Sequence, residues 1–278
     1  MKYKFDEHSI QGSKLLTKAY STSFSLGIKF LASRFHNPIY AIYGYVRLAD
    51  EIVDSFHGYQ QEKMLSELRR DTLQAIAEGI SINPVLNAFQ EIVNKYNIEW
   101  ELIETFLRSM EMDLSKQHYN QQEYEVYILG SAEVVGLMCL RVFMEGNNEE
   151  YERLKPYAMK LGSALQKINF LRDLNADQYA LGRQYFPQLV NGHFTEEVKK
   201  EIEADIEADF ELGYQGIKML PKDARFGVYV AYIYYSKLLN KIRQIPASVI
   251  MQERIRISDK HKYALFCSSL FRHSFNLL

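Results

Sequence analysis

The chain has 278 residues, with 33 Lys and Arg against 35 Asp and Glu, so its formal net charge is −2 at pH 7. This balance gives no bulk electrostatic reason to expect nucleic-acid binding. The two cysteines, Cys139 and Cys267, are too few for a disulfide framework and fit a reducing cytosol. The N-terminus lacks an apolar signal core and no run of 18 apolar residues occurs, so we expect a cytoplasmic protein without a spanning helix.

Helical periodicity runs through most of the chain, and six prolines interrupt it, so we expect an all-α, single-domain fold over residues 1–278 with nine or ten helices. A first helix is predicted over residues 8–20, with Ser9 as its N-cap, and Tyr20-Ser21-Thr22-Ser23 ends it. Pro38 is expected at the start of a helix that runs to about residue 55. Further helices are predicted over residues 61–78, 84–96, 99–116, 124–143, 151–176, 195–220, 222–245 and 259–275, with a loop over 182–192.

Two of these helices each carry a polar stripe whose members lie one helical turn apart. Residues three and four apart share one face of an α-helix. In the helix that starts near Pro38 the stripe consists of Tyr43, Arg47, Asp50 and Asp54. Around the end of the 151–176 helix it consists of Gln166, Asn169, Asp173 and Asp177. Each stripe thus presents two carboxylates one turn apart, beside apolar residues that would bury the helix.

Carboxylates one turn apart, with roughly 5–6 Å between their Cβ atoms, suit a hard cation bound through oxygen. Mg²⁺ keeps several waters and binds one or two protein carboxylates together with substrate phosphates. One such pair is most often solvated helix surface, but two pairs in apolar sequence favour a shared metal site. The predicted ligands are Asp50, Asp54, Asp173 and Asp177, with Asn169 as a further candidate. Arg47, one turn before Asp50, offers forked donors to a phosphate.

The same segments resemble the two signatures of the squalene/phytoene synthase family. They read Arg47-Leu48-Ala49-Asp50-Glu51-Ile52-Val53-Asp54 and Asn169-Phe170-Leu171-Arg172-Asp173-Leu174-Asn175-Ala176-Asp177, followed by Gly182-Arg183-Gln184-Tyr185-Phe186-Pro187. Ser21-Thr22-Ser23-Phe24 and Ala41-Ile42-Tyr43 resemble other landmarks of the family. These landmarks occur in order from about Ser21 to Arg254, and the chain is most similar to bacterial phytoene synthases.

The resemblance implies an isoprenoid-synthase-type helical bundle around a central cavity, and a prenyltransferase that joins two prenyl diphosphates head to head. It implies Mg²⁺, or Mn²⁺ in its place, and a cyclopropylcarbinyl diphosphate intermediate. Tyr43 and Arg47 join the four aspartates as candidate catalytic residues. The candidate substrate-binding residues are Ser21, Ser23, Arg47, Gln166, Asn169, Arg172, Tyr235 and Arg254.

The residues leave three functions open. The leading hypothesis is phytoene formation from two geranylgeranyl diphosphates, for carotenoid biosynthesis. The alternative is squalene or dehydrosqualene formation from farnesyl diphosphate, with NADPH used only if squalene forms. A third hypothesis is a catalytically silent helical assembly partner, against which the intact acidic pairs argue. The amphiphilic substrates and the hydrocarbon product predict peripheral attachment to the inner face of a membrane.

Three positions depart from the family pattern. Glu133 stands where many members carry a small residue, and it is either a buried, hydrogen-bonded carboxylate or a helix edge. Leu129 stands where many carry a tyrosine, and Tyr127 would face about 160° away from it on an ideal helix. Tyr20 stands where a histidine often precedes the first serine.

Several candidates also have structural interpretations. Arg172 could form only a surface ion pair with Asp173, Tyr43 and Tyr235 could belong to an aromatic core, and Arg254 could lie on a solvated face. The small residues Gly130-Ser131-Ala132 either leave cavity volume, which favours a C20 substrate, or serve helix–helix contact.

Overall fold

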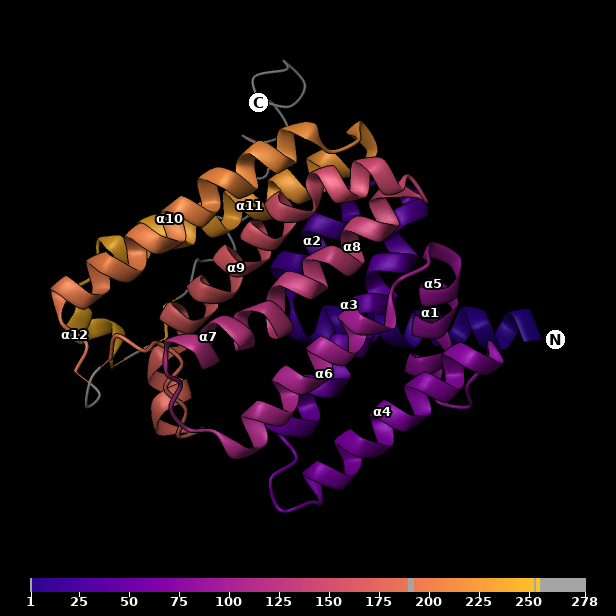
Figure 1. The fold of residues 1–278 in the computed structure, drawn as a ribbon, viewed down its shortest axis with the longest axis horizontal. Coiled ribbons are helices and arrows are strands. Elements are labelled where there is room, and N and C mark those ends of the chain that lie inside the picture. The colour runs from indigo at the N-terminus through magenta and orange to yellow at the C-terminus, as the bar shows by residue number, and fades with distance from the viewer. Residues whose placement is uncertain (1, 190–192, 253, 256–278) are drawn as a thin grey trace.

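The computed structural model describes residues 2–189, 193–252 and 254–255, and every regular element within these ranges is a helix (Figure 1). The elements are α1 (Lys2–Tyr20), α2 (Thr22–Lys29), α3 (Ser33–Asp54), α4 (Gln61–Glu78), α5 (Pro84–Tyr96), α6 (Trp100–Ser115), α7 (Gln121–Ile128), the π-helical turn η1 (Leu129–Glu133), α8 (Val134–Met144), α9 (Asn148–Tyr179), α10 (Glu196–Met219), α11 (Lys222–Arg243) and α12 (Ala247–Ile250). The prediction of an all-α fold is confirmed.

The helices form two groups on either side of a central pair, α8 and α9 (Figure 1). On one side α1 packs against α3 and α5, and α4 packs against α5. On the other side α10 packs along α9, and α11 joins α10 to the short helix α2. Helix α3, which carries one acidic stripe, thus belongs to the first group and packs against α8, whereas α9, which carries the other stripe, belongs to the central pair.

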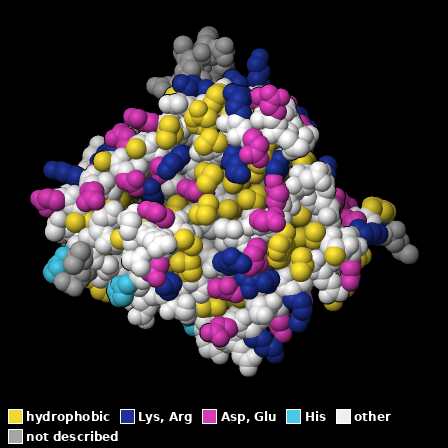
Figure 2. Space-filling model, in the orientation of Figure 1, with side chains coloured by type: hydrophobic (Ala, Val, Ile, Leu, Met, Phe, Trp, Pro, Cys, Tyr) yellow, Lys and Arg dark blue, Asp and Glu magenta, His cyan; other side chains and the backbone are white. Residues whose placement is uncertain are grey.

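Two apolar clusters stabilise these groups. One lies among the N-terminal helices and α8, where the rings of Tyr45 and Phe89 stack with centroids 3.9 Å apart. The other lies among α7 and the C-terminal helices, where Phe170 stacks on Tyr185 with centroids 4.0 Å apart. On the face shown in Figure 2, basic and acidic side chains are interspersed around exposed apolar ones.

Several predicted boundaries agree with the structure, and two predicted helix starts are wrong. Helices α4 and α5 have the expected limits, and the Asn83 side chain caps α5 at Val85 N and Leu86 N. Ser9 is not an N-cap, because α1 begins at Lys2 and the Ser9 hydroxyl donates to the Phe5 carbonyl over 2.8 Å. Pro38 is the sixth residue of α3 and not its first, so it cannot donate the helical hydrogen bond to the carbonyl of Arg34. The helix expected over 259–275 lies outside the described residues.

The helix count also differs from the expected nine or ten, because the part of the chain that the structure describes has twelve α-helices and one π-helical turn. The predicted break after Tyr20 is a single residue, Ser21, whose Oγ accepts from Phe24 N over 3.2 Å and starts α2. The helix predicted over 124–143 is divided into α7, η1 and α8. These short elements follow from tertiary packing, which a periodicity argument does not include.

The π-helical turn is located where Gly130 packs against α6. A Cβ atom on Gly130 would lie 2.6 Å from the carbonyl oxygen of Thr105 and 2.7 Å from the Cβ of Ser109. The backbone of η1 thus approaches α6 more closely than any side chain would permit. Because a π-turn accommodates one more residue than an α-turn, it changes the helical phase between α7 and α8.

One helical stretch, Gln121–Met144, has the length and mean hydropathy of a membrane-spanning segment, and 50% of its most apolar window is buried inside the fold. This stretch consists of α7, η1 and α8, and it packs against α6 and α9. An apolar core helix of a globular protein meets the same criteria of length and composition.

Candidate active site

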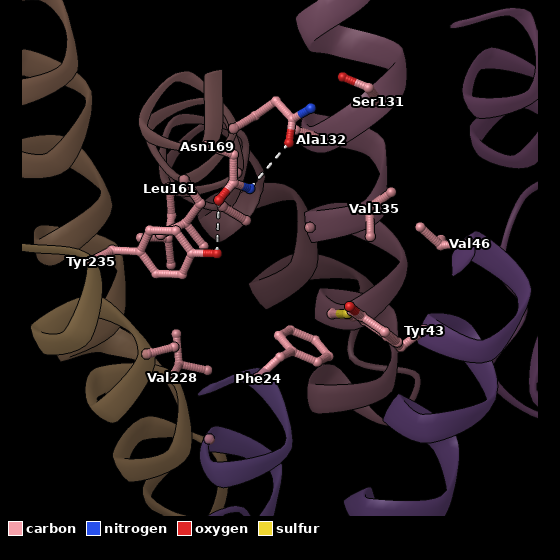
Figure 3. Close-up of a pocket in the computed structure, with 18 of the residues that line it drawn as sticks. Phe24, Tyr43, Val46, Ser131, Ala132, Val135, Leu161, Asn169, Val228 and Tyr235 are labelled. Atoms are coloured by element: carbon pink, nitrogen blue, oxygen red, sulfur yellow. Dashed lines mark hydrogen bonds between the residues drawn. The ribbon is translucent and has the colours of Figure 1, made fainter. Parts of the chain in front are cut away.

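A cavity of about 440 Å³ lies among α2, α3, α8, α9, α10 and α11, and Figure 3 shows part of it. One end is lined by the five carboxylates of Asp50, Asp54, Asp113, Asp173 and Asp177. The rest of the wall is largely apolar and includes side chains from every one of these helices. A cavity of this kind has a charged end for a polar group and a dry remainder for hydrocarbon.

Helices α3 and α9 bring the two predicted acidic pairs to the same end of the cavity. Burial, together with the charge of Asp54, raises the pKa of Asp50 to about 8. Burial, together with the charges of Asp173 and then Asp54, raises the pKa of Asp177 to about 8. Since Asp54 on α3 acts on Asp177 on α9, the two pairs lie close enough to repel each other. The predicted convergence of the two stripes is therefore present.

Arginine side chains are distributed unevenly over this cluster. Arg183 Nη1 donates to Asp54 Oδ1 over 2.5 Å, and its Nη2 donates to the Val53 carbonyl over 3.0 Å. Asp173 accepts from Arg172 Nε over 3.0 Å, and Arg254 Nε lies 2.6 Å from Asp173 Oδ1. Asp54 and Asp173 thus have direct cationic partners.

The carboxylates at this end of the cavity suit divalent ions that take some of their ligands from water and substrate. Within the described residues, no three acidic, histidine or cysteine side chains converge closely enough to hold one ion on their own. Mg²⁺ does not require such a cage, because it binds through one or two carboxylates and completes its shell with waters and phosphate oxygens. The raised pKa values of Asp50 and Asp177 report carboxylates that lack sufficient countercharge, which a bound cation would supply.

Asn169, the predicted amide ligand, is oriented by a short chain of hydrogen bonds (Figure 3). The Tyr235 hydroxyl donates to Asn169 Oδ1 over 3.2 Å, and Asn169 Nδ2 donates to Gln166 Oε1 over 3.4 Å. All three side chains line the cavity. Tyr235 is therefore a cavity residue with a polar contact, and its ring also packs against the C-terminal apolar cluster.

The remaining predicted site residues lie in the wall or at the rim. Ser21, Tyr43 and Arg172 line the cavity, and Arg172 is largely buried, so its pair with Asp173 is not a surface ion pair. The Tyr43 ring stacks on Phe24 with centroids 4.6 Å apart. Arg47 and Arg254 lie at the rim, outside the lining. The side chain of Ser23 lies outside the described part of the chain.

Sequence reasoning missed Asp113, the centre of a buried polar cluster beside the acidic pairs. Its Oδ1 accepts from the hydroxyls of Tyr119 over 3.2 Å and Tyr185 over 3.0 Å, and its Oδ2 accepts from Tyr127 over 2.6 Å. Arg183 Nε lies 3.8 Å from Asp113 Oδ1. Burial raises the pKa of Asp113 to about 6. Nothing in the spacing around Asp113 sets it apart, although Arg183 and Tyr185 stand in the quoted Gly182–Pro187 segment.

Two of the departures noted in the sequence now have structural explanations. Tyr127 lines the cavity and donates to Asp113, whereas Leu129 lies outside the lining. The two side chains belong to different apolar clusters, as their spacing on a helix predicts, and Tyr127 is the one that faces the site. Glu133 is partly buried outside the cavity lining, and burial raises its pKa, which the positive charge of Lys160 opposes.

The three small residues of η1 serve different purposes. Gly130 serves helix–helix contact with α6. Ser131 and Ala132 line the cavity, and within the described part of the chain the buried Ser131 Oγ has no hydrogen-bond partner. The backbone of Ala132 also contacts Gly162 of α9, where a Cβ would lie 2.7 Å from the Ala132 carbonyl oxygen. Helix–helix contact thus explains Gly130, and cavity volume explains Ser131, while Ala132 takes part in both.

Comparisons with known proteins agree with this site. The model of the squalene/phytoene synthase family matches residues 17–261. The chain is 26% identical over 262 residues to the phytoene synthase of Arthrospira platensis, covering 85% of this chain and 84% of that protein. It is 27% identical over 204 residues to the 4,4′-diapophytoene synthase of Staphylococcus haemolyticus, covering 70% and 68%.

Among solved structures, a dehydrosqualene synthase superposes with a TM-score of 0.84 over 99% of both chains, at 20% sequence identity. That likeness concerns the fold, and the family match rests on the sequence. The matched region includes both acidic stripes and the Gly182–Pro187 segment. The chain belongs to the squalene/phytoene synthase family, whose members are head-to-head prenyltransferases.

Proposed function

We propose that this protein condenses two geranylgeranyl diphosphates to phytoene in a Mg²⁺-dependent reaction of carotenoid biosynthesis. The observation that carries the proposal is the cavity itself, with five carboxylates at one end and an apolar wall elsewhere. Mg²⁺ bound by Asp50, Asp54, Asp173 and Asp177, with Asn169, would neutralise the leaving diphosphates. The first condensation releases one diphosphate and one proton and forms a cyclopropylcarbinyl diphosphate, and its rearrangement releases a second diphosphate and a second proton.

The residues of this chain bind, orient and shield the substrates. Arg172 and the rim residues Arg47 and Arg254 offer donors to diphosphate oxygens. The apolar walls keep water from the allylic cations, which would otherwise form alcohols. The Tyr235 hydroxyl keeps the Asn169 amide oriented, as a hydrogen-bond partner often does for the side chain that binds a metal ion.

Cavity length and small wall residues support the C20 substrate. The lining follows α9 from Asp173 to Leu154, and the 19 residue steps between them correspond to roughly 28 Å of helix. Ser131 and Ala132 leave volume in the wall that larger side chains would occupy. The similarity to the phytoene synthase of Arthrospira platensis over 85% of the chain supports the same choice.

The test is incubation of the purified protein with geranylgeranyl or farnesyl diphosphate and Mg²⁺, with and without NADPH, followed by mass analysis of the hydrocarbon. We expect a C40 product from the C20 substrate without NADPH. A C30 product formed preferentially from farnesyl diphosphate would replace phytoene by dehydrosqualene, or by squalene if NADPH is required. If neither diphosphate is consumed, the protein is an assembly partner.

The metal assignment is tested with Asp173→Asn, which keeps the side-chain shape but removes a charge. We expect turnover to fall by roughly 10²-fold or more, by analogy with the removal of one electrostatic stabiliser. The matched control is Asp71→Asn on α4, where an exposed aspartate pairs only with a neighbouring arginine on the surface. Near wild-type turnover of the Asp173 variant would contradict the assignment.

We also propose that the protein is cytoplasmic and attaches peripherally to the inner face of a membrane. On α1, Leu15 and Tyr20 are 69% and 49% exposed, and Lys14 and Lys18 flank Leu15. Apolar and basic side chains together suit an anionic lipid surface. We expect high-salt and carbonate washes to release the protein from membranes. Retention in the pellet after both washes would contradict peripheral attachment.

A further inference from the structure

The guanidinium group of Arg47 is stacked on the ring of Tyr20. The Arg47 Cζ atom lies 4.1 Å from the ring centroid, well inside the range of a cation–π interaction. Tyr20 is the last residue of α1, and Arg47 belongs to the acidic stripe of α3. A residue outside both polar stripes therefore contacts the arginine of one of them.

Stacking leaves the edges of the guanidinium group available, because it occupies only one face of the plane. Arg47 Nη2 contacts Glu51 Oε1, and Nη1 lies 3.7 Å from Asp50 Oδ2, beyond hydrogen-bond distance. Arg47 Nε is buried and has no hydrogen-bond partner among the residues that the structure describes. Within the described residues, Nε and Nη1 of Arg47 thus lack a close acceptor, and Nη1 lies next to the cavity carboxylate of Asp50.

We propose that Tyr20 is a positioning residue, whose ring fixes the plane of the Arg47 guanidinium so that Nη1 is presented to the diphosphate of a substrate. This inference rests on the proposed function, since it requires that Arg47 meets a diphosphate. A fixed plane helps, because an arginine that is already ordered loses less conformational freedom when it binds an anion.

The alternative is that Tyr20 only stabilises the corner between α1 and α2. The structure assigns that task to other groups. Ser21 N donates to the Thr17 carbonyl over 2.9 Å, and Ser21 Oγ accepts from Phe24 N over 3.2 Å. The Tyr20 side chain is half exposed, and its ring faces the Arg47 guanidinium.

The test is calorimetric titration of the protein with inorganic pyrophosphate in the presence of Mg²⁺. We expect pyrophosphate to bind roughly two- to fivefold more weakly to Tyr20→Leu, which keeps an apolar side chain but removes the ring. Tyr20→Phe keeps the ring and should retain most of the affinity. The matched control is Tyr3→Ala, which removes an exposed tyrosine at the other end of α1.

A double-mutant cycle separates positioning from a structural effect. In an Arg47→Met background, Tyr20→Leu should cause no further loss of pyrophosphate affinity, because the ring then has no guanidinium to hold. Thermal unfolding of each variant checks that the protein is folded at the temperature of the titration. Tyr20→Ala provides a second variant without the ring.

Two results would overturn the proposal. Unchanged pyrophosphate affinity in folded Tyr20→Leu and Tyr20→Ala would show that the ring does not position Arg47. An equal loss with and without Arg47 would show that Tyr20 acts through the fold. If the wild-type protein itself binds no pyrophosphate, both this inference and the proposed function fail. Failure of the inference alone would change only the results for the variants and would leave binding by the wild-type protein intact.

Discussion

Binding of a divalent cation to this site should release protons, and the number released should depend steeply on pH. The perturbation is addition of Mn²⁺ alone to the metal-free protein, without diphosphate. Burial and neighbouring carboxylates raise the pKa of both Asp50 and Asp177 to about 8. A carboxyl that binds a metal ion must first lose its proton, so the metal competes with protons at these two residues.

The magnitude follows from the two pKa values. With a pKa of about 8, each carboxyl is about nine-tenths protonated at pH 7 and about one-tenth protonated at pH 9. We therefore expect the protein to release about 1.8 protons on saturation at pH 7 and about 0.2 at pH 9. The affinity for the metal ion therefore falls as the pH falls below about 8. With two displaced protons, the fall is up to roughly 100-fold per pH unit.

The assay is calorimetry in two buffers with different ionisation enthalpies, which gives the proton count at each pH. Asp50→Asn should lower the count at pH 7 by about one proton, since an amide has none to lose. A release below about half a proton at pH 7, or equal release at pH 7 and pH 9, would refute the reasoning. Either result would mean that these carboxyls are ionised before the metal arrives or do not bind it.

Three further predictions concern other parts of the molecule. Ser131→Phe should lower the ratio of turnover on geranylgeranyl to farnesyl diphosphate about tenfold or more, because the ring fills cavity volume, and an unchanged ratio in the folded variant would count against this. In urea unfolding, Gly216→Ala should cost roughly 1–3 kcal/mol, because its Cβ would lie 2.4 Å from a side chain of α9, whereas Gly12→Ala, with nothing within 4 Å, should stabilise by about 0.4–1 kcal/mol. Arg254→Gln should strengthen Mn²⁺ binding, measured by electron paramagnetic resonance, because its guanidinium now competes for Asp173, and weaker binding would contradict this.

The features that repeat along one helix were predictable from the sequence. Both acidic stripes follow the helical period, so their placement on α3 and α9 and their dry surroundings could be inferred residue by residue. The all-α class followed from the same periodicity.

Features that depend on contacts between distant segments were not predictable. Asp113 is one of several acidic residues on the amphipathic helix α6, and nothing in the sequence distinguishes it from the others. Only the fold brings three tyrosine hydroxyls to it. The start of α3 at Ser33 and the separate helix α2 also depend on packing. The role of Tyr127 likewise depends on a contact between α7 and α6, because its hydroxyl donates to Asp113.

The wide turn η1 also affects how this chain tolerates insertions and deletions. Removing one residue from an ordinary helix rotates everything beyond it by about 100°, which moves one wall of side chains off its partners. Removing one residue from a π-turn leaves an α-turn and keeps the helical phase on both sides. Among the described helices, Leu129–Glu133 is therefore the segment where a single-residue deletion should disturb the flanking packing least. Sequence comparisons with relatives that lack the turn should accordingly place a one-residue gap within these five residues.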